Sequence, residues 1–139
     1  MIKTWSLGYK KARKRAEKIY SKIGTIQCPA LNDIISFSKW GFKHLIYKGR
    51  IPRTRGEQKR RFVLLPYATQ IIKNPQAIIL YEEKEIEYKP NKISQARFWA
   101  FVEEIKNCKV KVVIMQVGIG NKKFCSIMGN NVKTKKPPK

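Results

Sequence analysis

The stretch Val110-Lys-Val-Val-Ile-Met-Gln-Val-Gly-Ile-Gly-Asn-Lys-Lys-Phe-Cys-Ser-Ile-Met128 decides the fold class. It contains two β-rich runs, residues 110–117 and 123–128, on either side of the turn Gly118-Ile-Gly-Asn121. β-branched runs joined by a short glycine-containing turn are typical of a β-hairpin. Because this turn joins two strands and does not open a helix, we interpret it as a hairpin turn and not as a mononucleotide-binding loop.

The preceding residues extend this hairpin into an antiparallel meander that follows several helices. Further strands are predicted at residues 77–81, 86–88 and 97–105, and a short β-rich run at residues 32–38. Apolar residues at near-helical spacing predict helices over residues 9–23, 39–48 and 67–73. Helices followed by strands indicate an α+β domain.

The charge of the chain indicates a polyanionic partner. Thirty-one lysine and arginine residues against nine acidic ones give a net charge of +22, and 18 of the basic residues lie in residues 1–75. A field of this size attracts nucleic acid, which is the expected partner. An anionic membrane surface is the competing partner, but the basic residues are spread along the chain and not concentrated on one amphipathic helix.

Composition excludes several other classes. Three cysteines without CxxC spacing and one histidine make no recognisable zinc site, and adjacent glutamates at residues 82–87 are unlike a two-metal site, so neither metal nor cofactor is expected. No apolar run approaches the ~20 residues that span a bilayer. Unpaired cysteines favour a reducing compartment, and we expect a cytoplasmic protein with no membrane partner.

The only histidine, His44, lies in a run rich in lysine and arginine between Gly41 and Arg61. A helix over residues 39–48 would place His44 and Lys48 one turn apart, where both can act on one phosphate. RNA cleavage by its own 2′-hydroxyl requires a positioned acid or base and cations that stabilise the developing charge. The alternative is an incidental surface histidine.

The segment from Gly49 to Gly56 is predicted to be an exposed anion-binding loop. Three arginines surround a proline in it, and arginine forms forked hydrogen bonds with phosphate. The alternative is a solvated charged face. The residues predicted to bind nucleic acid are Lys43, Arg50, Arg53, Arg55, Lys59 and Arg61.

Residues 41–49, the arginine-rich loop and the closing hairpin together resemble phage- and mobile-element-associated nuclease domains of the barnase, EndoU, colicin and RelE-like (BECR) superfamily. The resemblance covers about residues 32–130. It implies N-terminal helices packed on a roughly four-stranded antiparallel sheet, and metal-independent RNA cleavage that leaves a 2′,3′-cyclic phosphate. It also implies that His44 is the acid or base, that Lys48 and Arg60 steady the phosphate, and that Ser126 forms a hydrogen bond with a phosphate oxygen.

Three segments follow from this interpretation: a basic helical arm over residues 1–31, a nuclease domain over 32–130 and a disordered basic tail over 131–139. We expect a toxin- or effector-type endoribonuclease that acts on RNA, with transfer RNA as one candidate substrate and a cognate inhibitor protein as one candidate partner. The alternative is a non-catalytic basic nucleic-acid-binding protein, for which the same charge suffices.

Overall fold

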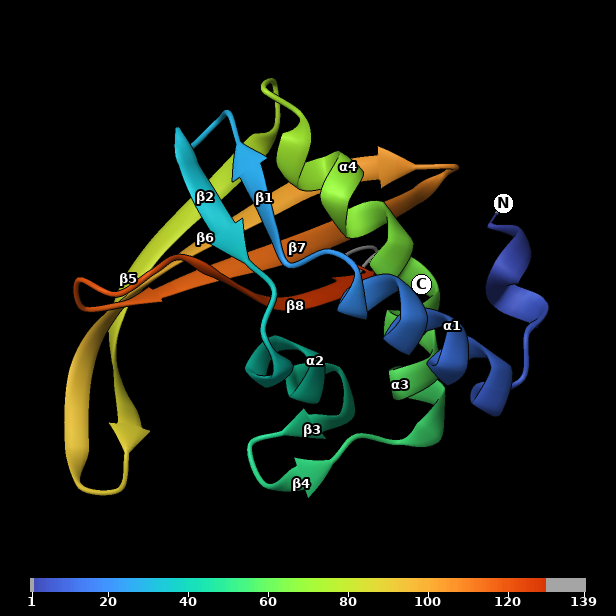
Figure 1. Cartoon of the computed structure of the whole chain (residues 1–139), viewed down its shortest axis with the longest axis horizontal. Coiled ribbons are helices and arrows are strands. Elements are labelled where there is room, and N and C mark those ends of the chain that lie inside the picture. Colours follow the sequence, from blue (N-terminus) through green and yellow to red (C-terminus); the bar gives the residue numbers. More distant parts are fainter. Residues whose placement is uncertain (1, 130–139) are drawn as a thin grey trace, which may run out of the picture.

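The computed structural model describes residues 2–129 and has an α+β fold with one six-stranded curled sheet and a small two-stranded ribbon (Figure 1). The helices are α1 (Tyr9–Ser21), α2 (Lys39–Ile46), α3 (Arg55–Leu64) and α4 (Ala68–Lys73), with short 3-10 helices η1 (Lys3–Ser6) and η2 (Leu65–Tyr67). The strands are β1 (Thr25–Cys28), β2 (Asp33–Ser36), β3 (Tyr47–Lys48), β4 (Ile51–Pro52), β5 (Ile78–Lys89), β6 (Lys92–Ile105), β7 (Cys108–Val117) and β8 (Lys123–Gly129).

The large sheet has the strand order β1-β2-β8-β7-β6-β5. Strands β5 to β8 form an antiparallel meander, as the sequence predicts, although the strands predicted at residues 77–81 and 86–88 are one continuous strand, β5. The expected sheet of about four antiparallel strands is nevertheless incomplete, because a β1–β2 hairpin adds two strands and pairs with β8 in parallel through Ser36 and Lys123. Pro29 follows β1 in the turn of this hairpin, so it interrupts neither strand.

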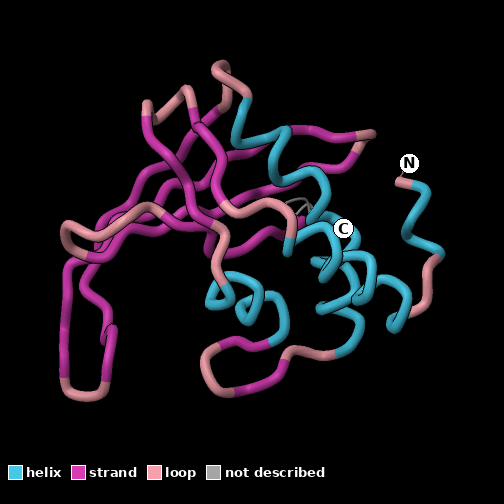
Figure 2. Tube along the Cα trace, viewed as in Figure 1, coloured by secondary structure: helices cyan, strands magenta, loops and turns pink. Residues whose placement is uncertain are grey.

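The helices gather on one side of the molecule, and the long β5–β6 hairpin projects on the other (Figure 2). Along β7 the side chains of Val110, Val112 and Ile114 are fully buried, because alternate residues of a strand point to the same face. They belong to the same core as residues of α2, α3 and α4. The opposite face of the meander carries the intervening residues, such as Lys111 and Val113.

Helix α1 is part of this core. Ala12, Ala16 and Tyr20 are buried, and the Tyr20 hydroxyl donates a hydrogen bond to the Ser38 carbonyl at 2.6 Å. The lysines of α1, including Lys14, lie on its exposed face. Residues 2–31 therefore pack with the rest of the fold, and the boundary expected at residue 31 falls inside the β1–β2 hairpin. The expected tail, residues 131–139, lies outside the described residues.

Helix α2 lies directly against the edge of β8. Beyond the Ser36–Lys123 pair no strand pairs with this edge among residues 2–129, and α2 and α3 cover it instead. A Cβ atom at Gly41 would lie 2.6 Å from both the Phe124 carbonyl oxygen and the Tyr20 hydroxyl. Glycine at this position therefore allows α2 to approach the sheet closely enough to present His44 at its edge.

Within residues 2–129, no helix combines the length and the apolar character that a membrane crossing requires.

Candidate active site

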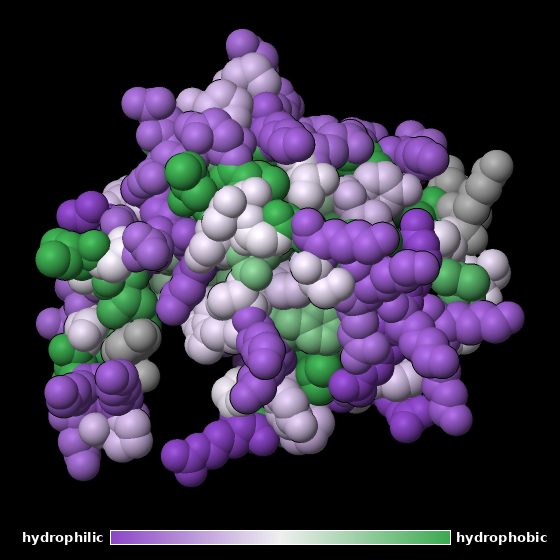
Figure 3. All heavy atoms as spheres, in the orientation of Figure 1, coloured by the Kyte–Doolittle hydropathy of each residue, from purple (hydrophilic) through white to green (hydrophobic). Residues whose placement is uncertain are grey.

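A cleft of about 790 Å³ lies on the face of the meander that the helices do not cover. Its lining consists of His44, Lys48, Arg53, Leu80, Tyr81, Glu82, Lys84, Phe98, Ala100, Lys111, Val113, Cys125, Ser126 and Met128. Strand pairing places Leu80, Ala100, Val113 and Ser126 in one row across β5 to β8, and this row forms its floor. In the space-filling view a notch separates the β5–β6 hairpin from the region of β3 and β4 (Figure 3).

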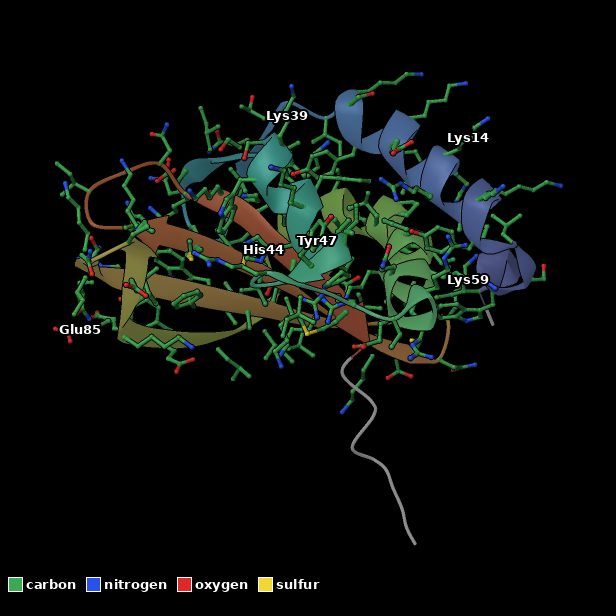
Figure 4. The ribbon with its side chains drawn as sticks, turned by 90° about the horizontal axis from the view of Figure 1, so that it is seen from below. Lys14, Lys39, His44, Tyr47, Lys59 and Glu85 are labelled. Carbon is green, nitrogen blue, oxygen red and sulfur yellow. The ribbon has the colours of Figure 1, made fainter. Side chains whose placement is uncertain are left out.

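His44 lies in the last turn of α2, above the closing strands of the sheet (Figure 4). Its ring centroid is 4.2 Å from that of Trp40, one helical turn earlier. Burial, followed by the positive charges of Arg53, Lys123 and Arg61, lowers the pKa of His44 below its usual value of 6.5. The imidazole is therefore neutral near pH 7, which is the form that accepts a proton.

Arg53 fixes the end of α2. Its Nε donates a hydrogen bond to the His44 carbonyl at 3.0 Å, and its backbone amide donates to the Ile46 carbonyl at 2.7 Å. The Arg53 carbonyl in turn accepts from Gln58 Nε2 at 2.8 Å, and the Tyr9 hydroxyl donates to Gln58 Oε1 at 2.5 Å. Gln58 is buried, so these bonds connect α1 to the backbone of His44 through the protein interior.

Arg61 and Ser126 form a unit at the edge of β8. Arg61 Nη1 donates to Ser126 Oγ at 2.6 Å and to the Ile127 carbonyl at 3.3 Å. Burial, followed by the charge of Arg53, lowers the pKa of Arg61 to about 10, so the guanidinium remains charged at neutral pH. Ser126 Oγ accepts this hydrogen bond, and its own hydrogen stays available for a ligand oxygen.

Cys125 is unsuited to nucleophilic chemistry. It occupies a bulge of β8, between the pairs Ile114–Phe124 and Val113–Ser126. Burial raises the pKa of Cys125 to about 11, so its thiol stays protonated at neutral pH. A protonated thiol is a poor nucleophile, so Cys125 is not a candidate for that role.

The predicted helical relationship between His44 and Lys48 is wrong. Helix α2 ends at Ile46, because Tyr47 has extended backbone angles and pairs with Pro52 in the β3–β4 ribbon. Lys48 is therefore a strand residue, although it lines the same cleft as His44. Gly49 lies in the turn of the ribbon with φ of +65° and does not terminate the helix.

The segment predicted as an anion-binding loop is divided among three structures. Arg50 is exposed at the ribbon turn, and Arg53 holds the His44 carbonyl. Arg55 begins α3 and places its guanidinium carbon 4.5 Å from the centroid of the Tyr9 ring. The three arginines therefore do not form one phosphate fork, because strand pairing and the start of α3 point them in different directions.

The remaining predicted residues lie at different distances from the cleft. Lys43 lines a small pocket on the other side of His44. Arg60 lines a separate pocket of about 390 Å³ with Trp5. Lys59, also on α3, lies away from His44, toward α1 (Figure 4).

Sequence reasoning missed two contributors to the site. Lys111 enters the cleft from β7, and the alternation of its buried neighbours Val110 and Val112 could have placed it on the open face. The structural role of Gln58 had no sequence signal, since its two partners come from α1 and from the segment before α3.

Neither a cluster of metal ligands among the described residues nor a similar known protein adds to this description of the site. Among residues 2–129, no group of three or more histidine, cysteine, aspartate or glutamate residues could hold a metal ion. Comparisons of the chain with protein-family models, with curated proteins and with solved structures gave no match.

Proposed function

We propose that the protein is a metal-independent endoribonuclease of the toxin or effector type, in line with the sequence resemblance to the BECR superfamily. The observation that carries the proposal is the position of His44 in the wall of a cleft that also presents Lys48, Arg53 and Lys111, where burial and positive charges lower the pKa of His44. The proposed substrate is RNA, with transfer RNA as one candidate. The proposed place of action is the cytoplasm, and a cognate inhibitor protein is a proposed second partner.

His44 is the general base of the proposed reaction. The imidazole takes the proton of a ribose 2′-hydroxyl, and the 2′-oxygen attacks the adjacent phosphorus. The bond from phosphorus to the 5′-oxygen breaks, that oxygen takes a proton from a solvent water, and the protonated His44 returns its proton to the solvent. The products are a 2′,3′-cyclic phosphate and a 5′-hydroxyl, so atoms and charge balance without another reactant.

The cations stabilise the charge that develops on the phosphate. Lys48 and Lys111 line the cleft, and Arg61 sits behind Ser126. Ser126 can donate its hydroxyl hydrogen to a phosphate oxygen because Oγ already accepts from Arg61. Preorganised donors of this kind lower the barrier without reorganising during the reaction.

A binding protein without chemistry is the rival function. Its support is the exposed basic face of α1, which lies outside the cleft, together with the net charge of +22. Such a protein would bind polyanions through phosphate contacts and would give His44 no role.

The test is cleavage of an end-labelled RNA oligonucleotide in EDTA, with analysis of the new ends. We expect cyclic phosphate and 5′-hydroxyl ends, and no cleavage where a 2′-deoxynucleotide replaces the attacking ribose. His44→Gln should lower the cleavage rate by about 10² to 10⁴-fold with little change in affinity. Lys18→Gln, on the exposed face of α1, is the control and should change affinity alone. Intact RNA, or a His44→Gln rate equal to that of the wild type, would favour the binding protein.

A further inference from the structure

A second, smaller pocket of about 150 Å³ adjoins the cleft at His44. It is lined by Trp40, Lys43, His44, Tyr47 and Gly49, and we call it the α2–β3 pocket. His44 also lines the cleft, so the two hollows share this residue. In Figure 4, His44 and Tyr47 lie side by side where α2 passes into β3.

The two aromatic residues of the α2–β3 pocket have no role in the hydrophobic core. Neither Trp40 nor Tyr47 belongs to the core cluster or to the apolar residues packed against it. Tyr47 is 40% exposed, and the Trp40 ring contacts His44 and Lys123 Nζ, which lies 4.3 Å from its centroid. Their aromatic side chains therefore lie outside the packed core and line the pocket.

The charges around the α2–β3 pocket select among the ligands that aromatic residues bind. Lys43 lines the pocket, and the Lys123 ammonium lies over Trp40. These positive charges repel a quaternary ammonium or another cation, which an aromatic pocket would otherwise attract. An anionic ligand with a flat ring is favoured, and a nucleotide has both properties.

We propose that the α2–β3 pocket stacks the base of an unpaired ribonucleotide against Trp40 and Tyr47 and thereby sets its ribose beside His44. This inference rests on the proposed ribonuclease function and specifies its substrate as single-stranded RNA or an RNA loop. A base inside a duplex is already stacked and paired, so it cannot enter a pocket between aromatic side chains. The phosphates that follow the bound nucleotide would continue into the cleft.

The test compares the affinities of two oligonucleotides that differ only in one base. Both are short single strands with 2′-deoxy sugars, which cannot be cleaved by 2′-hydroxyl attack, and one carries a single abasic site. The wild type should bind the complete strand about 5- to 150-fold more tightly than the abasic strand, the range for one stacked base. Tyr47→Ala should remove most of this preference, whereas Tyr47→Phe should keep it.

Ile51→Ala is the matched control, because Ile51 is an exposed apolar residue of the same ribbon and does not line the pocket. The salt dependence of binding gives a second readout. Tyr47→Ala should weaken affinity without changing the log–log slope against salt, since no phosphate contact is lost. Trp40→Ala is expected to act like Tyr47→Ala. If Trp40→Ala does not fold, the exposed position of Tyr47 still carries the test.

The outcomes separate this inference from the proposed function. Equal affinity of the wild type for the complete and abasic strands would overturn the stacking site, even if RNA is cleaved to cyclic ends. A base preference that depends on Tyr47 would support the site, even if no RNA is cleaved and the ribonuclease proposal falls.

Discussion

Arg61 Nη1 donates a hydrogen bond to Ser126 Oγ at 2.6 Å, across 65 residues of sequence. This bond joins α3 to the unpaired edge of β8, where it sets the position of the serine that the resemblance assigns to phosphate binding. Because Ser126 is only 5% exposed, water cannot readily replace either partner.

Removal of either partner should lower the stability of the protein, and the losses from the two single variants should not add up in the double variant. Ser126→Ala leaves a largely buried guanidinium without one acceptor, and we expect a loss of about 1.5–3 kcal/mol in the free energy of unfolding. The double variant Arg61→Met/Ser126→Ala should lose less than the sum of the single variants. Urea unfolding of the four proteins measures the coupling, and strictly additive losses would show that the bond contributes nothing.

The pH dependence of folding stability should show the protonation of His44. Its folded-state pKa is lowered below 6.5, so between that value and 6.5 the unfolded chain binds more protons. His44 should therefore reduce folded stability as the pH falls through this window and should have no effect above about pH 7. His44→Gln should remove this contribution from unfolding curves measured across the window. The rate of catalysis by a neutral base should also rise with pH, with the midpoint of the rise below pH 6.5.

Arg53→Gln should raise the pKa of His44, because the Arg53 charge is the second cause of its lowering, after burial. The chain has one histidine, so its imidazole proton resonances can be followed by NMR without ambiguity. A pKa that stays unchanged in Arg53→Gln would mean that the Arg53 charge does not act on the imidazole.

Arg50 and Arg53 should differ in their effects on RNA affinity and on the melting temperature. Arg50→Gln removes an exposed charge, and we expect weaker RNA binding with an unchanged melting temperature. Arg53→Gln breaks the hydrogen bond to the His44 carbonyl and should lower the melting temperature as well. Calorimetry and RNA titration of both variants test the distinction, which equal melting temperatures would contradict.

Gly41→Ala should be strongly destabilising. The added Cβ would meet the Phe124 carbonyl and the Tyr20 hydroxyl at 2.6 Å, a distance at which the helix and the strand must move apart. We expect a loss of about 1–3 kcal/mol, typical of overpacking. Gly56→Ala is the matched control in α3, because the nearest atom to its Cβ lies at 4.0 Å. Similar unfolding curves for the two variants would refute the close approach of α2 to β8.

RNA binding should weaken steeply with salt. If about six phosphates contact the basic surface, the log–log slope should be roughly −4 for a single strand. Fluorescence anisotropy titrations at salt concentrations from about 50 to about 300 mM measure this slope. A slope shallower than about −2 would limit the interface to a few phosphates.

The meander was predictable because its signals are local. Alternating apolar residues in β7 and the glycine turn before β8 specify both strands and their antiparallel pairing. The β-rich run at residues 32–38 predicted β2, but β1 and the pairing of β2 with β8 were missed, because β1 has only four residues and the pairing spans most of the chain. Long-range pairings of this kind leave little local pattern.

Helix α3 was not predicted, although its sequence contains a pattern that is typical of the start of a helix. Thr54 caps its first turn by accepting a hydrogen bond from the Glu57 amide at 3.1 Å, and Thr-x-x-Glu is a capping-box pattern. Which of Arg60 and Arg61 reaches the sheet could not be read from sequence, because neighbouring helical residues point about 100° apart and the absolute orientation of the helix depends on packing. His44 could be chosen from the sequence as a candidate site residue. Its lowered pKa could not be predicted, because Arg53, Lys123 and Arg61 come together around it only in the folded structure.

β8 lies in the interior of the sheet, between β2 and β7, yet it is the last strand to be synthesised among the described residues. A nascent chain that ends before Lys123 has β1–β2 and β5–β7 as separate pieces, without Phe124 and Ile127 to complete the core. It also lacks Ser126. The cleft can therefore assemble only after β8 has been synthesised, so a translating cell would not meet the proposed ribonuclease site on a shorter nascent chain.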